Sequence, residues 1–357
     1  MIIVDAHLDL AWNALNWNRD LTQPVPDIRR LEAQVKEEHR GGNTVSFPEM
    51  RKGDVALCLA TLLARASGLG EDKLDYRTRG IACAMARGQL AYYRIMEGQG
   101  WLRMLRNWQD VEAHVRDWQK SGRDSTPLGF ILSMEGADPI LSPSQVIDWW
   151  NDGLRIVGLA HYGVSAYAHG TGVSGGLTSQ GADLLKAMNE VGMVLDVTHL
   201  ADESFWQAVE KFQGPVLASH NNCRSLVPGE RQFSDEQIRC LIERGSVIGI
   251  ALDSWMLYSG YDPGQTSNSL VSLEAAVDHI DHICQLAGNA RNAAIGSDLD
   301  GGFGREQSPH DLGTIADLQK IPAILRKRGY SKADIEAVMH GNWLRFFRES
   351  WEGRRVS

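Results

Sequence analysis

Residues that can bind a metal ion or transfer a proton stand at the ends of several short apolar runs. His7 and Asp9 stand at the end of the first run (IIVDAHLD), and Glu135 directly follows a later one (LGFILSM). Four more such residues close later runs: His161, His199, His220 and Asp298. Imidazole and carboxylate groups without clustered cysteines favour zinc or a similar ion at a catalytic site.

The spacing of these residues suggests how two ions would be held. His7 and Asp9 are two positions apart, so in a strand their side chains point to the same side and can bind one divalent ion. His199 and His220 follow neighbouring runs and can grip a second ion, with one oxygen of Glu135 for each. Two such ions would hold a bridging hydroxide and polarise a carbonyl. A lone histidine at a strand end is more often structural, but their repetition over six runs favours a metal site.

The elements that must position these residues can be read from the alternation of apolar and amphipathic segments. Runs rich in Val, Ile and Leu, typical of buried parallel strands, span residues 2–9, 54–61, 128–134, 154–160, 192–198, 215–220, 246–252 and 292–298. Helices are expected at 76–97, 110–121, 142–153, 180–192, 202–212, 234–245 and 272–288. Ser234, with Gln237 three residues later, predicts a capping box, whereas Ser272 lacks such a partner.

Eight apolar runs predict an α/β fold of the (β/α)8 TIM barrel type, because eight strands close such a barrel. The alternative is an open doubly wound sheet, but no glycine-rich dinucleotide loop follows the first run. Residues 10–53, with several prolines and glycines, are predicted to form an elaborated N-terminal loop region over the site. We place no domain boundary, so residues 1–357 are expected to form a single domain. In a barrel the strand ends converge, which would bring the residues above together.

Composition excludes several classes of protein. The chain has 357 residues and a formal net charge of −9, which argues against a nucleic-acid partner. It has no apolar run long enough to span a membrane, no secretory leader and no hydrophobic tail, so we expect no membrane association. The five cysteines are scattered, with no CxxC pair. That pattern is typical of reduced thiols, and we expect a cytoplasmic protein.

Taken together, the motifs resemble the membrane (renal) dipeptidase family, zinc dipeptidases of the amidohydrolase superfamily. The matching segments lie in order over nearly the whole chain: DAHLDL, SMEGAD, LAHYG, GGLTSQGADLLKAMNEVGMVLDVTHLADESF, PVLASHNNCRSL, ERQFSDEQI, IGSDLDGG and HGNWLRFF. The stretch 175–238 is the most specific, because it combines two histidines with Arg231 and the SDEQI helix start.

The resemblance implies two zinc ions per chain, bridged by Glu135 and a water or hydroxide. The implied ligands are His7, Asp9 and Glu135 for the first ion, and Glu135, His199 and His220 for the second.

The resemblance also implies that three further residues bind the substrate. His161 would stabilise the oxyanion, Arg231 would bind the substrate carboxylate, and Asp298 would act as acid and base near the bridging water and the substrate amino group. These implications predict a homodimeric metallo-dipeptidase that acts on small dipeptides, including those with a D-residue at the C-terminal position. The alternative is a binuclear-metal amidohydrolase acting on another small amide, an N-acyl amino acid or a lactone.

Two segments depart from the family pattern. Where the family often has an aromatic residue that helps to hold the substrate carboxylate, the segment GIALDSWML has Asp253 and Trp255. An acidic residue there would repel an α-carboxylate or attract a cationic side chain. The segment ALCLATLLARA, which ends near Arg65, is less aromatic than its family counterpart.

Overall fold

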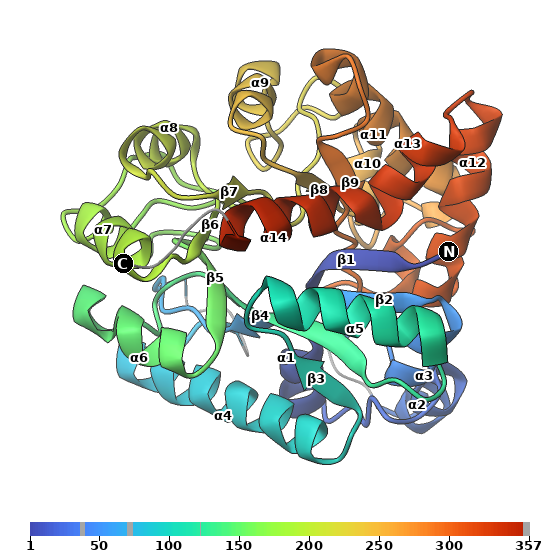
Figure 1. Cartoon of the computed structure of the whole chain (residues 1–357), viewed down its shortest axis with the longest axis horizontal. Helices are drawn as coiled ribbons and strands as arrows, with labels where there is room; N and C mark the ends of the chain where they lie inside the picture. The colour runs from blue at the N-terminus through green and yellow to red at the C-terminus, as the bar shows by residue number, and fades with distance from the viewer. Residues whose placement is uncertain (36–39, 70–73, 122, 353–357) are drawn as a thin grey trace.

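A computed structural model describes residues 1–35, 40–69, 74–121 and 123–352. Strands lie at its centre and helices surround them (Figure 1). The strands are β1 (Ile3–Leu8), β2 (Val55–Leu63), β3 (Leu102–Met104), β4 (Leu128–Glu135), β5 (Leu154–Gly158), β6 (Val194–Asp196), β7 (Val216–Leu217), β8 (Ile248–Ile250) and β9 (Ala293–Ile295). Neighbouring strands are parallel in the order β1-β2-β4-β5-β6-β7, and β8 pairs with β9.

The curled sheet confirms the predicted α/β barrel and each of its eight expected strands. A parallel bridge between Ala218 and Ile248 connects β7 to β8. At the seam between β9 and β1, the buried Asp5 carboxylate accepts hydrogen bonds from Ser297 N at 2.8 Å and Ser297 Oγ at 2.5 Å. A side chain therefore joins the first and last strands. The short β3, which the sequence did not predict, pairs with the start of β4.

The helices follow the expected alternation with the strands. Their bounds are α1 (Leu10–Asn16), α2 (Val25–Glu32), α3 (Phe47–Lys52), α4 (Arg79–Gly98), α5 (Trp108–Ser121), α6 (Val146–Asn151), α7 (Gly181–Val191), α8 (Asp202–Lys211), α9 (Asp235–Glu243), α10 (Ser254–Leu257), α11 (Leu273–Ala287), α12 (Ile321–Lys327), α13 (Lys332–Glu336) and α14 (Asn342–Glu352). The capping box of Ser234 and Gln237 is confirmed at the start of α9, and Ser272 makes no side-chain cap. None of the described helices is long and apolar enough to cross a membrane.

The prediction that residues 10–53 form a loop region was wrong in part, because α1, α2 and α3 lie within it. Pro26 and Pro48 occupy the first turns of α2 and α3, where a missing N–H costs nothing and the fixed φ favours a helix. Ser46 caps α3 by accepting a hydrogen bond from Glu49 N. The prolines thus begin helices instead of interrupting them. Residues 36–39 of this stretch lie outside the described part of the chain.

The two ends of the barrel differ in what covers them. Apolar side chains from the starts of the strands pack with Trp343, Phe346 and Phe347 of α14 in one cluster. The indole N–H of Trp343 also donates a hydrogen bond to Ile295 O at 2.9 Å. α14 crosses the middle of the view in Figure 1 and lies over the amino ends of the strands. The carboxyl ends, at the other side of the barrel, are left to form a site.

Candidate active site

The carboxyl ends of the strands position the predicted site residues with a regular spacing. His7 is the penultimate residue of β1, and Glu135 is the last residue of β4. Four others each come three residues after a strand: His161 after β5, His199 after β6, His220 after β7 and Asp298 after β9. The structure thus brings residues from distant parts of the sequence to one end of the barrel, as expected from the fold.

Asp9 reaches the site by a different route from the one the sequence suggested. It does not continue β1, which ends at Leu8, but stands at the N-cap position of α1. Its Oδ2 nevertheless lies 3.7 Å from Nε2 of His7. The pairing of His7 and Asp9 was therefore predicted correctly, but the shared strand face was the wrong reason for it.

Two of the site residues adopt a backbone conformation that is uncommon outside glycine. His199 has φ 66° and Asp298 has φ 57°. Non-glycine residues in the left-handed region carry strain, and such residues cluster at functional sites. Both residues lie in the loop that follows a strand, and both line the same cavity.

Glu135 stands between two groups of potential ligands. Its Oε2 lies 3.4 Å from Nε2 of His7, whereas its Oε1 lies 3.1 Å from Nε2 of His199 and 3.3 Å from Nε2 of His220. The two Nε2 atoms of His199 and His220 are 3.1 Å apart. One carboxylate therefore directs one oxygen to each group.

The donor set fits a divalent metal. Three groups of side chains each offer ligand atoms within 4.8 Å of one another: His7, Asp9 and Glu135; Glu135, His199 and His220; His7, His220 and Asp298. Nε2 of His7 and Oδ1 of Asp9 are buried and have no hydrogen-bond partner in the described part of the chain. Such unsatisfied atoms are costly unless something binds them. A cation would satisfy both.

Hydroxyl groups at Nδ1 of two of the histidines leave the Nε2 atoms of these rings able to bind a metal. Thr171 Oγ1 lies 3.0 Å from Nδ1 of His199 and donates its own proton to the His199 carbonyl at 3.3 Å, so it accepts from Nδ1–H. Ser219 Oγ lies 2.9 Å from Nδ1 of His220. A proton on Nδ1 leaves the Nε2 lone pair free to bind a metal. Sequence reasoning missed both hydroxyls; only Ser219, which precedes His220 directly, offered a local signal.

The electrostatics of the cluster also suit a cation. Burial lowers the pKa values of His199 and His220 well below the usual range, and nearby cationic groups act in the same direction. Burial alone would raise the pKa of Glu135, but His7 and the other imidazoles hold it well below its usual range. Burial raises the pKa of Asp298 well above its usual range. Burial alone would lower the pKa of His7, but Glu135 and Asp9 raise it well above its usual range. The neutral rings of His199 and His220 are in the form that binds a metal, and a metal at His7 would have to displace its proton.

The cavity beside this cluster contains the residues predicted to bind substrate. His161, Arg231 and Asp298 line it together with Trp255 and Asp253. The Arg231 guanidinium is buried and donates to the His220 carbonyl at 2.9 Å and to the Asn221 side chain. Burial, with the charges of Arg65 and Arg231 as additional causes, lowers the pKa of His161 to about 3. The structure therefore brings the predicted substrate-binding residues to the predicted metal ligands.

Two other residues near the site were assigned no role from the sequence. Arg65 contacts His161, with Nη1 3.0 Å from Nδ1. Asp300 is buried and accepts hydrogen bonds from Thr44 N at 2.8 Å and Val45 N at 2.9 Å. Asp300 therefore anchors the N-terminal region to the loop that carries Asp298, and it does not line the cavity.

The buried carboxyl group of Asp253 is expected to make the stability of the protein depend on pH. Burial raises its pKa to about 7, although Gln307 donates to both of its oxygens. Between the unfolded pKa of about 4 and the folded value, only the unfolded chain is ionised, so this group lowers stability as pH rises. Asp253→Asn is expected to raise the free energy of unfolding relative to the wild type by on the order of a few kcal/mol above pH 7, but little near pH 4.

Urea unfolding of the metal-free proteins at several pH values measures this difference. Asn is as good an N-cap as Asp, so the cap of α10 is kept. The exposed Asp262→Asn is the control and should show no such trend. A difference between Asp253→Asn and wild type that does not change between pH 4 and 8 would contradict the prediction.

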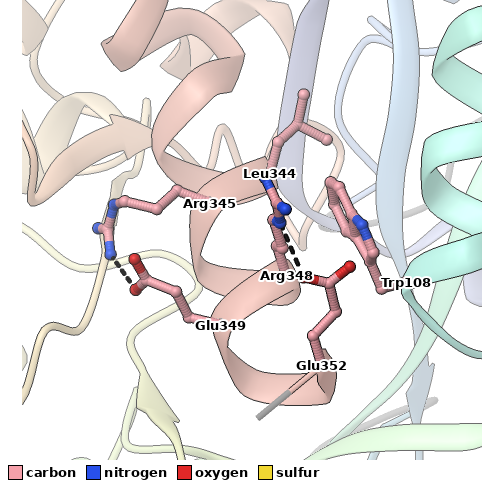
Figure 2. Close-up of a pocket in the computed structure, with 6 residues that line it drawn as sticks. All are labelled: Trp108, Leu344, Arg345, Arg348, Glu349 and Glu352. Carbon is pink, nitrogen blue, oxygen red and sulfur yellow. Dashed lines mark hydrogen bonds and ion pairs between the residues drawn. The ribbon is translucent and has the colours of Figure 1, made fainter.

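Other histidines and hollows do not add to this site. His279 and His282 of α11, which are three residues apart, are held in hydrogen bonds with Cys223 N and with Asp235 respectively. An open hollow over α14 is lined by Trp108 and by arginines and glutamates that pair with each other (Figure 2). The three groups of potential metal ligands among the described residues all lie at the opposite end of the barrel.

An α/β barrel with histidines and carboxylates gathered at its carboxyl end is the architecture of a metal-dependent hydrolase. The model of the membrane dipeptidase family (peptidase family M19) matches residues 1–355. The chain belongs to this family, and it is an enzyme of the metallo-dipeptidase class. The resemblance noted in the sequence is thereby confirmed.

Individual proteins agree with this assignment. Dipeptidase aclJ of Aspergillus oryzae is 28% identical over 352 residues, which cover 96% of this chain and 76% of that protein. Dipeptidase tcpJ of Claviceps purpurea is 28% identical over 227 residues, and the match spans 61% of this chain and only half of that protein. A metallopeptidase from Rhodobacter sphaeroides, solved with a phosphinate mimic of the dipeptide L-Ala-D-Ala, superposes with a TM-score of 0.78. That match covers 98% of this chain and 99% of the other at 20% identity, so it shows the fold.

Proposed function

We propose that this protein is a zinc dipeptidase that hydrolyses the peptide bond of dipeptides, including those with a D-residue at the C-terminal position. The observation that carries the proposal is the position of Glu135, with one oxygen toward His7 and the other toward His199 and His220. A carboxylate that directs one oxygen to each of two ligand groups fits a binuclear site. The dipeptide mimic bound by the Rhodobacter sphaeroides relative supports the choice of substrate and of its D-residue.

The residues of the proposed metal centre divide into two sets. His7, Asp9 and Glu135 would hold one zinc ion, and Glu135, His199 and His220 would hold the other. When bound, the ions would supply the Lewis acidity that makes water nucleophilic at neutral pH and polarises the scissile carbonyl.

The remaining site residues bind the substrate and move protons. Arg231 lines the cavity, and its guanidinium is held by the His220 carbonyl and the Asn221 side chain. There it would bind the free carboxylate of the substrate. His161 donates a hydrogen bond to the carbonyl oxygen as negative charge develops on it. Asp298 takes a proton from the attacking water and passes it to the leaving amine.

A combined metal and substrate analysis tests the proposal. We expect two zinc ions per chain and hydrolysis of L,L- and L,D-dipeptides. N-acyl amino acids and lactones, assayed in parallel, represent the alternative of another binuclear amidohydrolase. Fewer than one zinc per chain would contradict the metal proposal. Turnover of a lactone or an N-acyl amino acid without turnover of any dipeptide would favour the alternative.

We also propose that the enzyme is a cytoplasmic homodimer that needs no nucleic-acid or membrane partner. The five unpaired cysteines support a reducing compartment, and the net charge of −9 opposes binding to nucleic acid. The homodimer rests on the resemblance to the family. Light scattering at micromolar concentration tests the homodimer, and cell fractionation tests the cytoplasmic location.

A further inference from the structure

Arg65 is a buried arginine whose contact with the site passes through a histidine. It follows the end of β2, and its guanidinium lies 5.8 Å from the ring of Tyr162, the residue after His161. Its Nη1 is 3.0 Å from Nδ1 of His161. Arg65 is not among the described residues that line the cavity, whereas His161 is. Of the two lining residues that Arg65 contacts, His161 and Tyr162, only His161 receives a hydrogen-bonding contact from its guanidinium.

The chemistry of this contact determines where the imidazole carries its proton. A guanidinium has five N–H donors and no acceptor, and it stays charged in proteins. Nδ1 of His161 must therefore accept from Arg65, so it carries no proton. The single proton of the neutral ring is then on Nε2. Nε2 is the atom on the metal-ligand side, 3.7 Å from Oε1 of Glu135.

The neighbouring histidines show the opposite arrangement. Hydroxyl groups, which can accept a hydrogen bond from an N–H group, lie next to Nδ1 of His199 and His220. They are Thr171 Oγ1 at 3.0 Å and Ser219 Oγ at 2.9 Å. These two rings can present an Nε2 lone pair to a metal. The group that contacts Nδ1 therefore distinguishes the histidines. A hydroxyl contacts Nδ1 of the two potential metal ligands, His199 and His220, and a guanidinium contacts Nδ1 of His161, which would donate from Nε2.

We propose that Arg65 is a positioning residue that fixes His161 as the Nε2–H tautomer and aims this N–H at the oxygen of the scissile carbonyl. The proposal rests on the proposed function for its kinetic consequence, but the tautomer itself does not depend on any substrate. A ring free to carry its proton on Nδ1 would present a lone pair to the developing oxyanion, which would be repulsive.

Nitrogen NMR of the histidine side chains in the metal-free protein tests the tautomer directly. The signals of His161 are assigned by their loss in His161→Gln. We expect a protonated Nε2 and an unprotonated Nδ1 in the wild type and in Arg65→Lys, which keeps a donor. Arg65→Met, which keeps bulk but no donor, should give a mixture of the two tautomers. A wild-type His161 with its proton on Nδ1 would overturn the proposal without the need for any variant.

Kinetics of the metal-loaded enzyme provide the second measurement. Arg65→Met is expected to lower kcat by roughly 10- to 100-fold, as is typical for a group that orients a catalytic one, with little change in KM or zinc content. Arg65→Lys should recover much of the loss. Arg87→Met is the control. Arg87 packs over the ring of Trp149, and neither residue lines the cavity, so this variant should have the kcat of the wild type. Unchanged kcat in Arg65→Met would refute the proposal. Wild-type protein without dipeptidase activity would instead refute the proposed function and leave the NMR result to decide the role of Arg65.

Discussion

Glu135→Gln is expected to lose bound zinc and to lower kcat/KM by roughly 10³-fold or more, because metal ions contribute several kcal/mol to such reactions. The substitution keeps the shape of the side chain but removes the charge that both ligand groups share. Oε2 lies 3.4 Å from Nε2 of His7, and Oε1 lies 3.1 and 3.3 Å from Nε2 of His199 and His220. An amide can offer one neutral oxygen to one side only, and it places an NH2 group against the other. Zinc analysis and dipeptide kinetics measure the two effects together.

Glu190→Gln is the matched control for this variant. Glu190 lies on α7 and is exposed, so the same chemical change there should leave zinc content and kcat/KM unaltered. The strongest contrary result is a Glu135→Gln enzyme that keeps two zinc ions and wild-type activity. Loss of one zinc with most activity retained would show that a single ion is sufficient.

The sequence was sufficient to predict the barrel and the meeting point of the site residues. Buried parallel strands are continuous apolar runs, which are visible without a structure. Because each run carries its polar residue at or just beyond its end, a closed barrel can only bring these residues to one rim. The regular interval of three residues after β5, β6, β7 and β9 reflects this constraint.

The contacts that the sequence could not reveal are those between loops far apart in the chain. Arg65 and His161 are 96 residues apart, and Thr44 and Asp300 are 256 residues apart. No periodicity governs such contacts, because their geometry depends on how each loop packs on the finished barrel. The prolines of residues 10–53 misled for a related reason: proline ends a helix in its interior but favours one in its first turn.

Asp298→Asn is expected to lower kcat by roughly 10²- to 10⁴-fold, the range typical for loss of a general acid or base. The carboxyl group lines the cavity beside His161 and Arg231, and burial raises its pKa well above the usual range. A carboxylate with a raised pKa is a stronger base, so it is suited to take a proton from the attacking water and to pass it to the leaving amine. Asparagine has nearly the same shape but cannot transfer a proton. Dipeptide kinetics measure the loss, and zinc content measured on the same samples should stay at the wild-type value.

Zinc content separates this role from metal ligation. Oδ1 of Asp298 lies 3.7 Å from Nε2 of His7, and Asp298 forms a potential ligand group with His7 and His220. If Asp298 were a ligand, Asp298→Asn would lose metal as well as activity. Asp300→Asn, two residues away, provides the structural comparison. Its carboxylate accepts from the backbone N–H groups of residues 44 and 45, so an amide there would place donor against donor and lower the melting temperature. A loss of kcat in Asp298→Asn with unchanged zinc and melting temperature would support proton transfer and would contradict both metal ligation and a purely structural role.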